Sequence, residues 1–210
     1  MERNWLSWKA VWGAVATSLV AAACAVSNAP PLVAAASVVG IGYVVLVAYG
    51  HWSANLFGAL LGGLFGVLSY QAGFFGNALV NILFTIPASL WGVWYWKNHQ
   101  GESPRKMNDF QRKHFASGFV ALACVGMLYS FFAGSSLWYM DGFTAVMPVV
   151  ATLLLVTRYR EQWYLWIPYN ALEVVMWFWV ASAAPEMLAV LVMRIVFLLN
   201  SVIGFKLWHK

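Results

Sequence analysis

One stretch of the sequence combines aromatic, amide and carboxylate side chains at helical spacing. Five of them follow one another at steps of 3, 4, 3 and 4 residues: Trp163, Trp166, Asn170, Glu173 and Trp177. This spacing places them on one face of an α-helix. A tryptophan ring can stack on a flat or cationic ring, an amide can pair with an amide or a hydroxyl, and a carboxylate can balance positive charge. The pattern therefore favours binding of a flat heteroaromatic ligand, including a cationic one.

The composition places this helix face inside a membrane. The 210 residues are 62% hydrophobic and 9% charged, whereas a soluble domain has about 25% charged residues. Apolar stretches of about 20 residues, long enough to cross a bilayer, recur along the chain. The predicted spans are 5–27, 30–50, 53–71, 75–97, 114–134, 141–158, 162–182 and 186–208. The first span could also be read as a signal peptide, but its apolar stretch is long enough to span and favours a retained helix.

An acidic and a basic residue lie within the last two spans. Glu173 is nine residues before Ser182, and Arg194 is nine residues after Pro185, on either side of a short turn. At about 1.5 Å per residue both lie roughly 13 Å from that turn, so an ion pair at equal depth is expected. Charged groups inside a membrane are costly and often functional. The pair either fastens two helices together or takes part in binding, and the sequence leaves both open.

Basic residues gather on one predicted side of the membrane. With eight spans, eleven of the twelve Lys and Arg residues fall in the termini and loops of one side, and the twelfth is Arg194. Because cytoplasmic loops collect Lys and Arg, both termini are expected in the cytoplasm. The same bias explains the net charge of +5 without any nucleic-acid partner.

Catalytic and metal-binding patterns do not emerge from the sequence. Cys24 and Cys124 lie in separate spans near opposite helix ends, and the histidines lie at span ends or in loops without metalloprotease spacing. We therefore expect no enzyme, no metal and no cofactor. A channel is a further alternative class, but no segment reads as a selectivity filter.

A short motif occurs twice. The pattern S-x-x-G-x-x-x-W begins at Ser89 and again at Ser201, at an offset of 112 residues. Spans two to four and six to eight would then form two parallel triplets joined by span five, an arrangement in which carriers bind substrate between the halves. Pro87 and Pro168 are expected to bend the spans beside that site. The predicted divisions are 1–29 for an additional N-terminal helix, 30–97 for the first triplet, 98–140 for a loop and linking helix, and 141–210 for the second triplet.

Three segments resemble the PnuC transporters of nicotinamide riboside. They are Trp163-x-x-Trp166-x-x-x-Asn170, the segment from Asn81 to Trp96, and the segment from Gly204 to Trp208. The resemblance extends over about 30–210. It implies an all-α integral membrane protein with two three-helix bundles joined by a linking helix, related in shape to SWEET sugar transporters in a different topology. Some members carry an extra N-terminal helix, which agrees with eight spans.

The resemblance also implies a function. It is facilitated uptake of nicotinamide riboside across the bacterial cytoplasmic membrane through a midplane site, with phosphorylation by a cytoplasmic kinase that prevents exit and without a coupling ion. A homo-oligomer is implied, with a trimer as the candidate arrangement, and the partners are the small-molecule substrate and membrane lipid. Related carriers take thiamine or riboflavin, so these remain alternative substrates.

The resemblance assigns substrate-binding residues. Trp166 and Asn170 would contact the nicotinamide ring and its amide, and the remaining candidates are Trp163, Tyr169, Glu173, Arg194, Asn200, Trp52, Asn81, Phe84 and Ser89. One of these departs from the family pattern, because Ser89 stands where the family often carries glutamine. A shorter hydroxyl reaches less far and would alter the polar contacts to the substrate.

Overall fold

The computed structural model describes residues 3–209, with side chains described from Trp8 onward except that of Lys9. Its helices are α1 (Arg3–Val26), α2 (Pro31–Ala48), α3 (Ala54–Gln71), α4 (Phe75–Val80), the π-helical turn η1 (Asn81–Thr85), α5 (Ile86–Asn98), α6 (Asp109–Phe132), α7 (Trp138–Val156), α8 (Trp163–Ala183) and α9 (Leu188–Trp208), with 3₁₀ turns η2 (Arg160–Gln162) and η3 (Pro185–Met187). Every predicted span coincides with a helix, and α4, η1 and α5 together form the fourth. The side chains of Arg3, Trp5 and Lys9 and all of Lys210 lie outside the described part.

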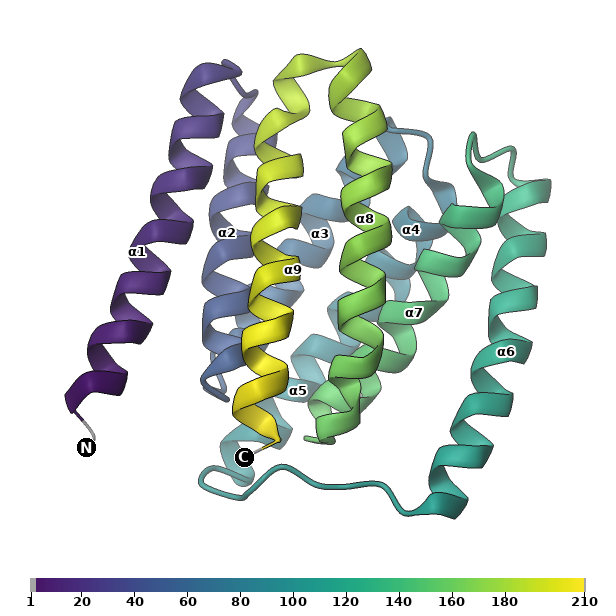
Figure 1. The fold of residues 1–210 in the computed structure, drawn as a ribbon. Helices are drawn as coiled ribbons and strands as arrows, with labels where there is room; N and C mark the ends of the chain where they lie inside the picture. Colours follow the sequence, from purple (N-terminus) through teal and green to yellow (C-terminus); the bar gives the residue numbers. More distant parts are fainter. Residues whose placement is uncertain (1–2, 210) are drawn as a thin grey trace.

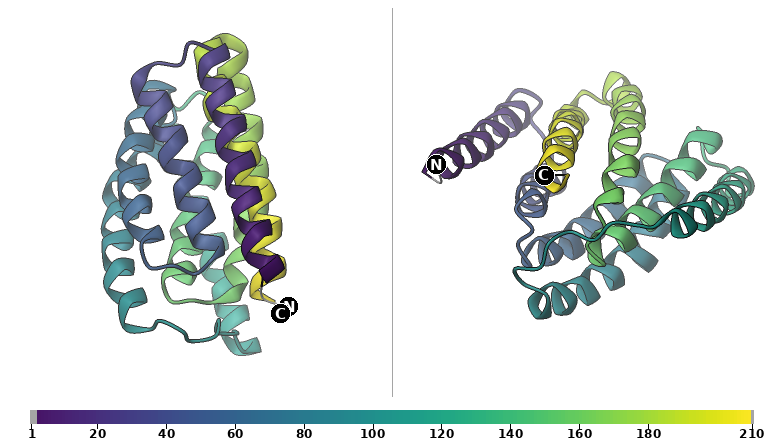
Figure 2. Two further views of the ribbon diagram at one scale, coloured as in Figure 1. Left: turned by 90° about the vertical axis from the view of Figure 1, so that its left-hand side faces the viewer. Right: turned by 60° about the horizontal axis from the view of Figure 1, so that its bottom comes forward.

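The helices stand side by side along one axis, with both chain ends at the same end of the bundle (Figure 1). Helix α9 packs on α8, α2 and α1, while α3 packs on α2 and α5 (Figure 2). Helix α6 lies at the edge and packs mainly on α7. Among the described residues, six helices are long and apolar enough to cross a membrane, and the apolar part of α1, Ala10–Val26, is shorter. Helix α8 is not among the six, because its composition includes Asn170, Glu173 and several tryptophans and tyrosines.

The prolines act differently in the two helices where bends were expected. The π-helical turn Asn81–Thr85 lies directly before Pro87, where the missing N–H and the bulky ring disturb the regular ladder of hydrogen bonds. The regular α-helix of the fourth span is therefore interrupted beside Pro87, where a bend was expected. Helix α8, in contrast, continues through Pro168 as one element. A third proline, Pro148, lies inside α7.

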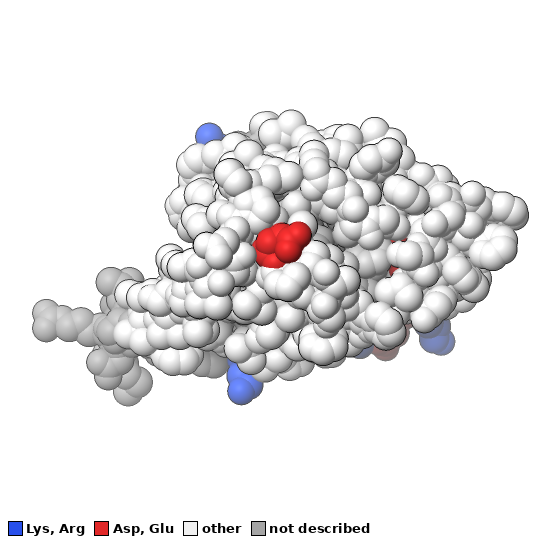
Figure 3. All heavy atoms as spheres, turned by 90° about the horizontal axis from the view of Figure 1, so that it is seen from above, with Lys and Arg blue, Asp and Glu red and all other residues white. Residues whose placement is uncertain are grey.

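The two ends of the bundle differ in charge. The loops 27–30, 72–74, 133–137 and 184–187 at the upper end contain one charged residue, Glu186. Seen from above, most of the face is uncharged: one prominent acidic cluster lies near its centre, a smaller acidic spot lies to the right of it, and basic atoms are visible only at the rim (Figure 3). The described basic residues other than Arg194 lie at or near the opposite end, which agrees with the predicted charge asymmetry.

Two loops join at this basic end. The segment 99–108 runs across it (Figure 2) and forms a β-bridge with Tyr159 through Arg105. The Arg105 N–H donates to the Arg158 carbonyl at 2.8 Å, and the Arg158 guanidinium donates to the carbonyls of His99 and Glu102. The pKa of Arg158 is lowered, because the effect of burial outweighs that of the nearby Glu102 carboxylate, which raises it. The connection between α5 and α6 is therefore held by the connection between α7 and α8.

A buried carboxylate holds the start of the fourth span. Asp141 in α7 is fully buried, and its oxygens accept hydrogen bonds from the Gly76 N–H at 2.9 Å, the Asn77 N–H at 3.0 Å, the Asn77 amide at 2.8 Å and the Ser135 hydroxyl at 2.7 Å. A negative charge is favourable at a helix N-terminus, where backbone N–H groups are otherwise unpaired. Asp141 thereby ties α7 to α4 across the bundle.

Replacement of this carboxylate is expected to destabilise the fold. Asp141→Ala leaves buried donors of Gly76, Asn77 and Ser135 without an acceptor, which costs about 3 kcal/mol of unfolding free energy. Asp141→Asn keeps one acceptor oxygen and should lose less. The measurement is the melting temperature of purified protein in detergent, with exposed Glu186→Ala as a control that changes by less than about 0.5 kcal/mol. Equal melting of Asp141→Ala and the unsubstituted protein would contradict the assignment.

Candidate functional site

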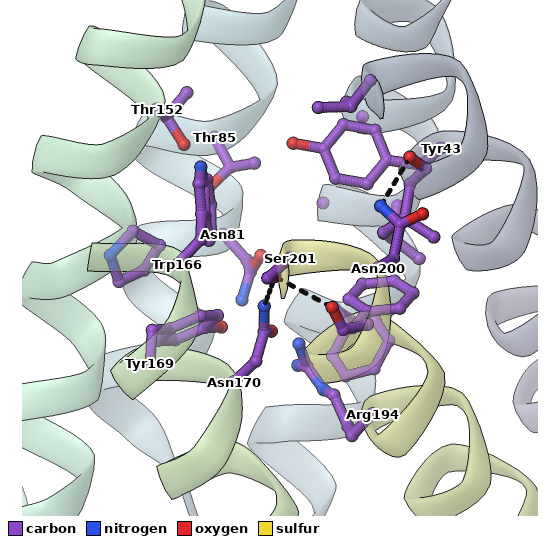
Figure 4. A pocket seen from close by; sticks show the side chains of 18 of the residues that line it. Tyr43, Asn81, Thr85, Thr152, Trp166, Tyr169, Asn170, Arg194, Asn200 and Ser201 are labelled. Atoms are coloured by element: carbon purple, nitrogen blue, oxygen red, sulfur yellow. Dashed lines mark hydrogen bonds between the residues drawn. The ribbon is translucent and has the colours of Figure 1, made fainter. Parts of the chain in front are cut away.

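A cavity lies inside the bundle, enclosed by residues of α2, α3, η1, α7, α8 and α9. The cavity volume is about 70 Å³. Its apolar walls include Val44, Leu61, Phe65, Pro148 and Phe197. Its polar and aromatic lining is shown in Figure 4: Tyr43, Asn81, Thr85, Thr152, Trp166, Tyr169, Asn170, Arg194, Asn200 and Ser201. An apolar cavity with a few converging polar groups is the usual form of a small-molecule site.

The aromatic wall comes from α8. The Trp166 and Tyr169 rings meet edge to face, with centroids 5.5 Å apart. The Trp166 indole N–H donates to the Gln162 amide oxygen at 3.2 Å, which restrains the orientation of the ring. Trp166 is only partly buried, whereas Tyr169 is 5% exposed. This wall offers aromatic surface to a ligand within the cavity.

Three asparagines line the cavity, and they differ in their hydrogen bonds: the Asn81 amide nitrogen donates to the Asn77 carbonyl at 2.9 Å. Asn200 donates to the Val44 carbonyl at 2.9 Å and accepts from the Trp12 indole at 3.1 Å, so it joins α9 to α2 and α1. Asn170 donates to the Ser201 hydroxyl at 2.7 Å, but its buried carbonyl oxygen has no hydrogen-bond partner among the described residues. Buried polar atoms are nearly always paired. The Asn170 carbonyl oxygen is therefore a buried acceptor of the lining that is open to a ligand.

The predicted ion pair between spans seven and eight is present. The Arg194 guanidinium contacts the Glu173 carboxylate at 2.7 Å, and the Trp177 indole donates to the same oxygen at 3.1 Å. The guanidinium also lies over the Phe65 ring, 4.1 Å from its centroid. Arg194 lines the cavity, whereas Glu173 lies outside the lining. The Glu173 carboxylate therefore neutralises the Arg194 guanidinium, which borders the cavity, although Glu173 does not line the cavity.

Seven of the eleven candidate residues line the cavity, and they come from η1, α8 and α9: Asn81, Trp163, Trp166, Tyr169, Asn170, Arg194 and Asn200. Glu173, Trp52, Phe84 and Ser89 lie outside the lining. Trp52 is near the basic end, beneath the Lys97 ammonium at 4.1 Å. Phe84 is half-buried in η1. Ser89 is 5% exposed, and its hydroxyl would be 3.0 Å from a Cβ placed on Gly58, so it packs against α3.

Four hydroxyl groups of the lining were not among the residues predicted for the site. Tyr43, Thr85 and Thr152 come from three different elements and carry no distinguishing pattern in the sequence. Ser201 was visible as the first residue of the repeated motif, although its place in the cavity was not expected. Hydroxyls on apolar helices commonly bond to their own backbone, so sequence alone does not separate them from lining residues.

The repeated motif has a packing explanation at each of its positions beyond serine. A Cβ on Gly92 would lie 2.4 Å from the Asn55 amide oxygen, and one on Gly204 would lie 2.2 Å from the Trp163 ring. The motif tryptophans Trp96 and Trp208 meet with centroids 6.3 Å apart. Glycine is required at both positions because a neighbouring side chain approaches the helix backbone. These similar contacts agree with an internal repeat. The arrangement in two parallel triplets stays a prediction.

Comparisons with known proteins agree with one another. A family profile described as "Nicotinamide mononucleotide transporter" matches residues 31–210. The nicotinamide riboside transporter PnuC of Neisseria mucosa is 31% identical over 99% of this chain and 82% of its own length. That of Haemophilus influenzae is 27% identical over 99% and 92%. A crystal structure of the vitamin B3 transporter PnuC matches with a TM-score of 0.86 and 30% identity, covering 97% of this chain and 91% of that one. The match confirms the predicted all-α membrane fold.

The contribution of the Glu173–Arg194 ion pair to the stability of the fold can be tested. Glu173→Gln or Arg194→Gln alone leaves a buried charge uncompensated, which costs about 3 to 5 kcal/mol of unfolding free energy. The double variant removes both charges and should lose less than the sum of the two. Thermal melting in detergent of all four proteins measures this coupling. Additive losses would mean that the two side chains do not act as a pair.

Proposed function

The chain belongs to the nicotinamide mononucleotide transporter family of membrane proteins, and we propose that its substrate is nicotinamide riboside. The family is one of transporters rather than enzymes. Two curated relatives are named for the riboside, whereas the family description names the mononucleotide. The charges of the cavity favour the riboside. Arg194 is the one cationic side chain among the described lining residues, and it is already paired with Glu173. A phosphate would therefore find no free cation.

The observation that carries the proposal is the juxtaposition of Trp166 and Asn170 in one cavity. The pyridinium ring of the riboside is flat and cationic, which suits stacking and cation–π contact with Trp166. Its carboxamide can donate to the unpaired Asn170 oxygen. The hydroxyls of Tyr43, Thr85 and Thr152 supply polar partners for the ribose. Together these groups match each part of the molecule.

We also propose a mode of transport. Substrate would bind near the membrane midplane between the triplets 30–97 and 141–210, and rocking of one triplet against the other would expose the site to each side in turn. Helix α6 within 98–140 would link the triplets, and α1 within 1–29 would be the additional helix. Transport would be facilitated and need no coupling ion, and phosphorylation by a cytoplasmic kinase would trap the product.

We propose the orientation of the protein in the membrane from the distribution of its basic residues. The basic end of the bundle would face the cytoplasm, with both termini there, in the cytoplasmic membrane of a bacterium. A homo-oligomer, with a trimer as the candidate, is proposed as the assembled form in membrane lipid. Thiamine and riboflavin are the alternative substrates to be tested.

Binding of nicotinamide riboside to detergent-purified protein should be abolished or strongly weakened by Trp166→Ala and by Asn170→Ala. Loss of stacking or of one hydrogen bond to the ligand is expected to reduce affinity at least tenfold. Isothermal titration calorimetry with nicotinamide riboside, its mononucleotide, thiamine and riboflavin measures the affinities. Selective binding of the riboside is the expected result.

Matched controls separate the site from general damage. Trp179 lies on the same helix as Trp166 and is 65% exposed, and the exposed Asn98 side chain donates to the Trp94 carbonyl at the end of α5. Trp179→Ala and Asn98→Ala should therefore bind as the unsubstituted protein does. Binding that survives both Trp166→Ala and Asn170→Ala would place the site elsewhere, and binding of thiamine or riboflavin instead would replace the substrate.

The proposed orientation has a separate test. A reporter that is active only in the cytoplasm, fused after Lys210, should be active in cells, because the basic end is retained on the cytoplasmic side. A reporter active only outside the cytoplasm should be inactive at the same position. The reverse pair of results would invert the topology.

A further inference from the structure

Ser201 determines which atoms Asn170 offers to the cavity. Its hydroxyl oxygen lies 2.8 Å from the Phe197 carbonyl and 2.7 Å from the Asn170 amide nitrogen, and both Ser201 and Asn170 are 3% exposed. A hydroxyl carries a single hydrogen. When Ser201 donates that hydrogen to Phe197, it can only accept from Asn170.

The opposite orientation of the amide is less favourable. If the Asn170 carbonyl oxygen faced Ser201, the hydroxyl would have to leave Phe197 in order to donate to it. Two hydrogen bonds would then become one. The backbone carbonyl of Phe197 therefore fixes the direction of the Ser201 hydroxyl, and the hydroxyl fixes the direction of the Asn170 amide (Figure 4).

The consequence is an unpaired acceptor at the binding site. Asn170 lines the cavity, and its carbonyl oxygen is buried without a hydrogen-bond partner among the described residues. Such an oxygen calls for a donor on the ligand, because an unpaired buried acceptor is unfavourable. A carboxamide has N–H groups to donate, whereas a carboxylate at the same place has only acceptor oxygens.

We propose that Ser201 is a positioning residue that makes the site select a carboxamide-bearing ring over its carboxylate analogue. The proposal rests on the proposed function and deepens it. Ser201 acts through Asn170, so removal of its hydroxyl frees the amide to turn. A freed amide can present its NH₂ group to a carboxylate, and the discrimination between the two ligands falls.

The test compares the affinities of nicotinamide riboside and nicotinic acid riboside for the purified full-length protein by calorimetry. The unsubstituted protein should prefer the amide by at least about 100-fold, since a site built to accept a hydrogen bond rejects a ligand that lacks the donor. In Ser201→Ala this ratio should fall about tenfold or more.

A matched pair of variants controls for shape. Ser201→Thr keeps a hydroxyl and should retain the ratio within about threefold, whereas Ser201→Val has a similar shape without the hydroxyl and should behave as Ser201→Ala does. This comparison decides the matter if the alanine variant folds poorly.

A control for a serine that hydrogen-bonds to the backbone of its own helix lies near the C-terminal end of α8. The Ser182 hydroxyl donates to the Phe178 carbonyl at 2.8 Å, the same local bond that Ser201 makes, but Ser182 is exposed and bonds to no described side chain. Ser182→Ala should leave both affinities unchanged.

The outcomes are distinct. Failure of the unsubstituted protein to bind nicotinamide riboside would overturn the proposed function and this inference with it. Binding that persists with the same ratio in Ser201→Ala, or equal ratios in Ser201→Thr and Ser201→Val, would overturn the inference alone. A lower affinity for both ligands with an unchanged ratio would likewise show that Ser201 only supports the packing.

Discussion

The ion pair between Glu173 and Arg194 is the interaction around which the second half of the bundle is arranged. Two opposite charges in an apolar interior must meet, because neither can be solvated there. Their contact at 2.7 Å sets the register of α8 against α9. About one turn before Glu173 in α8, the same register brings Asn170 opposite Ser201 of α9. The pair therefore aligns the polar face of α8 with the cavity and leaves the Arg194 charge neutralised at its border.

A second constraint is that polar groups in the interior need partners within the protein. Some side chains of the lining find such partners. Asn200 is satisfied by Val44 and Trp12, and the Trp166 indole by Gln162. The Asn170 carbonyl oxygen, the Trp163 indole N–H and the Arg194 Nε are buried in the lining without a hydrogen-bond partner among the described residues.

Polar contacts also connect segments that are distant in the sequence at both ends of the bundle. Asp141 holds the start of α4 at the upper end, and Arg158 and Glu161 hold the segment 99–108 at the basic end. In the proposed rocking mechanism, motion of one triplet against the other must work within these two connections. The interrupted helix at η1, next to the cavity, provides an irregular backbone between them.

The sequence alone determined the eight helices, the charge asymmetry of the two ends, the Glu173–Arg194 pair and the aromatic and polar face of α8. Hydropathy, charge and helical spacing are properties of single segments or of two segments joined by a short turn, so they can be read along the chain. Only the tertiary structure decided that Tyr43, Thr85, Thr152 and Ser201 join the lining and that Ser89, Phe84 and Trp52 lie outside it. The walls of a cavity depend on how each helix is rotated toward its neighbours, and that rotation is set by packing among distant segments such as the approach of Trp163 to Gly204.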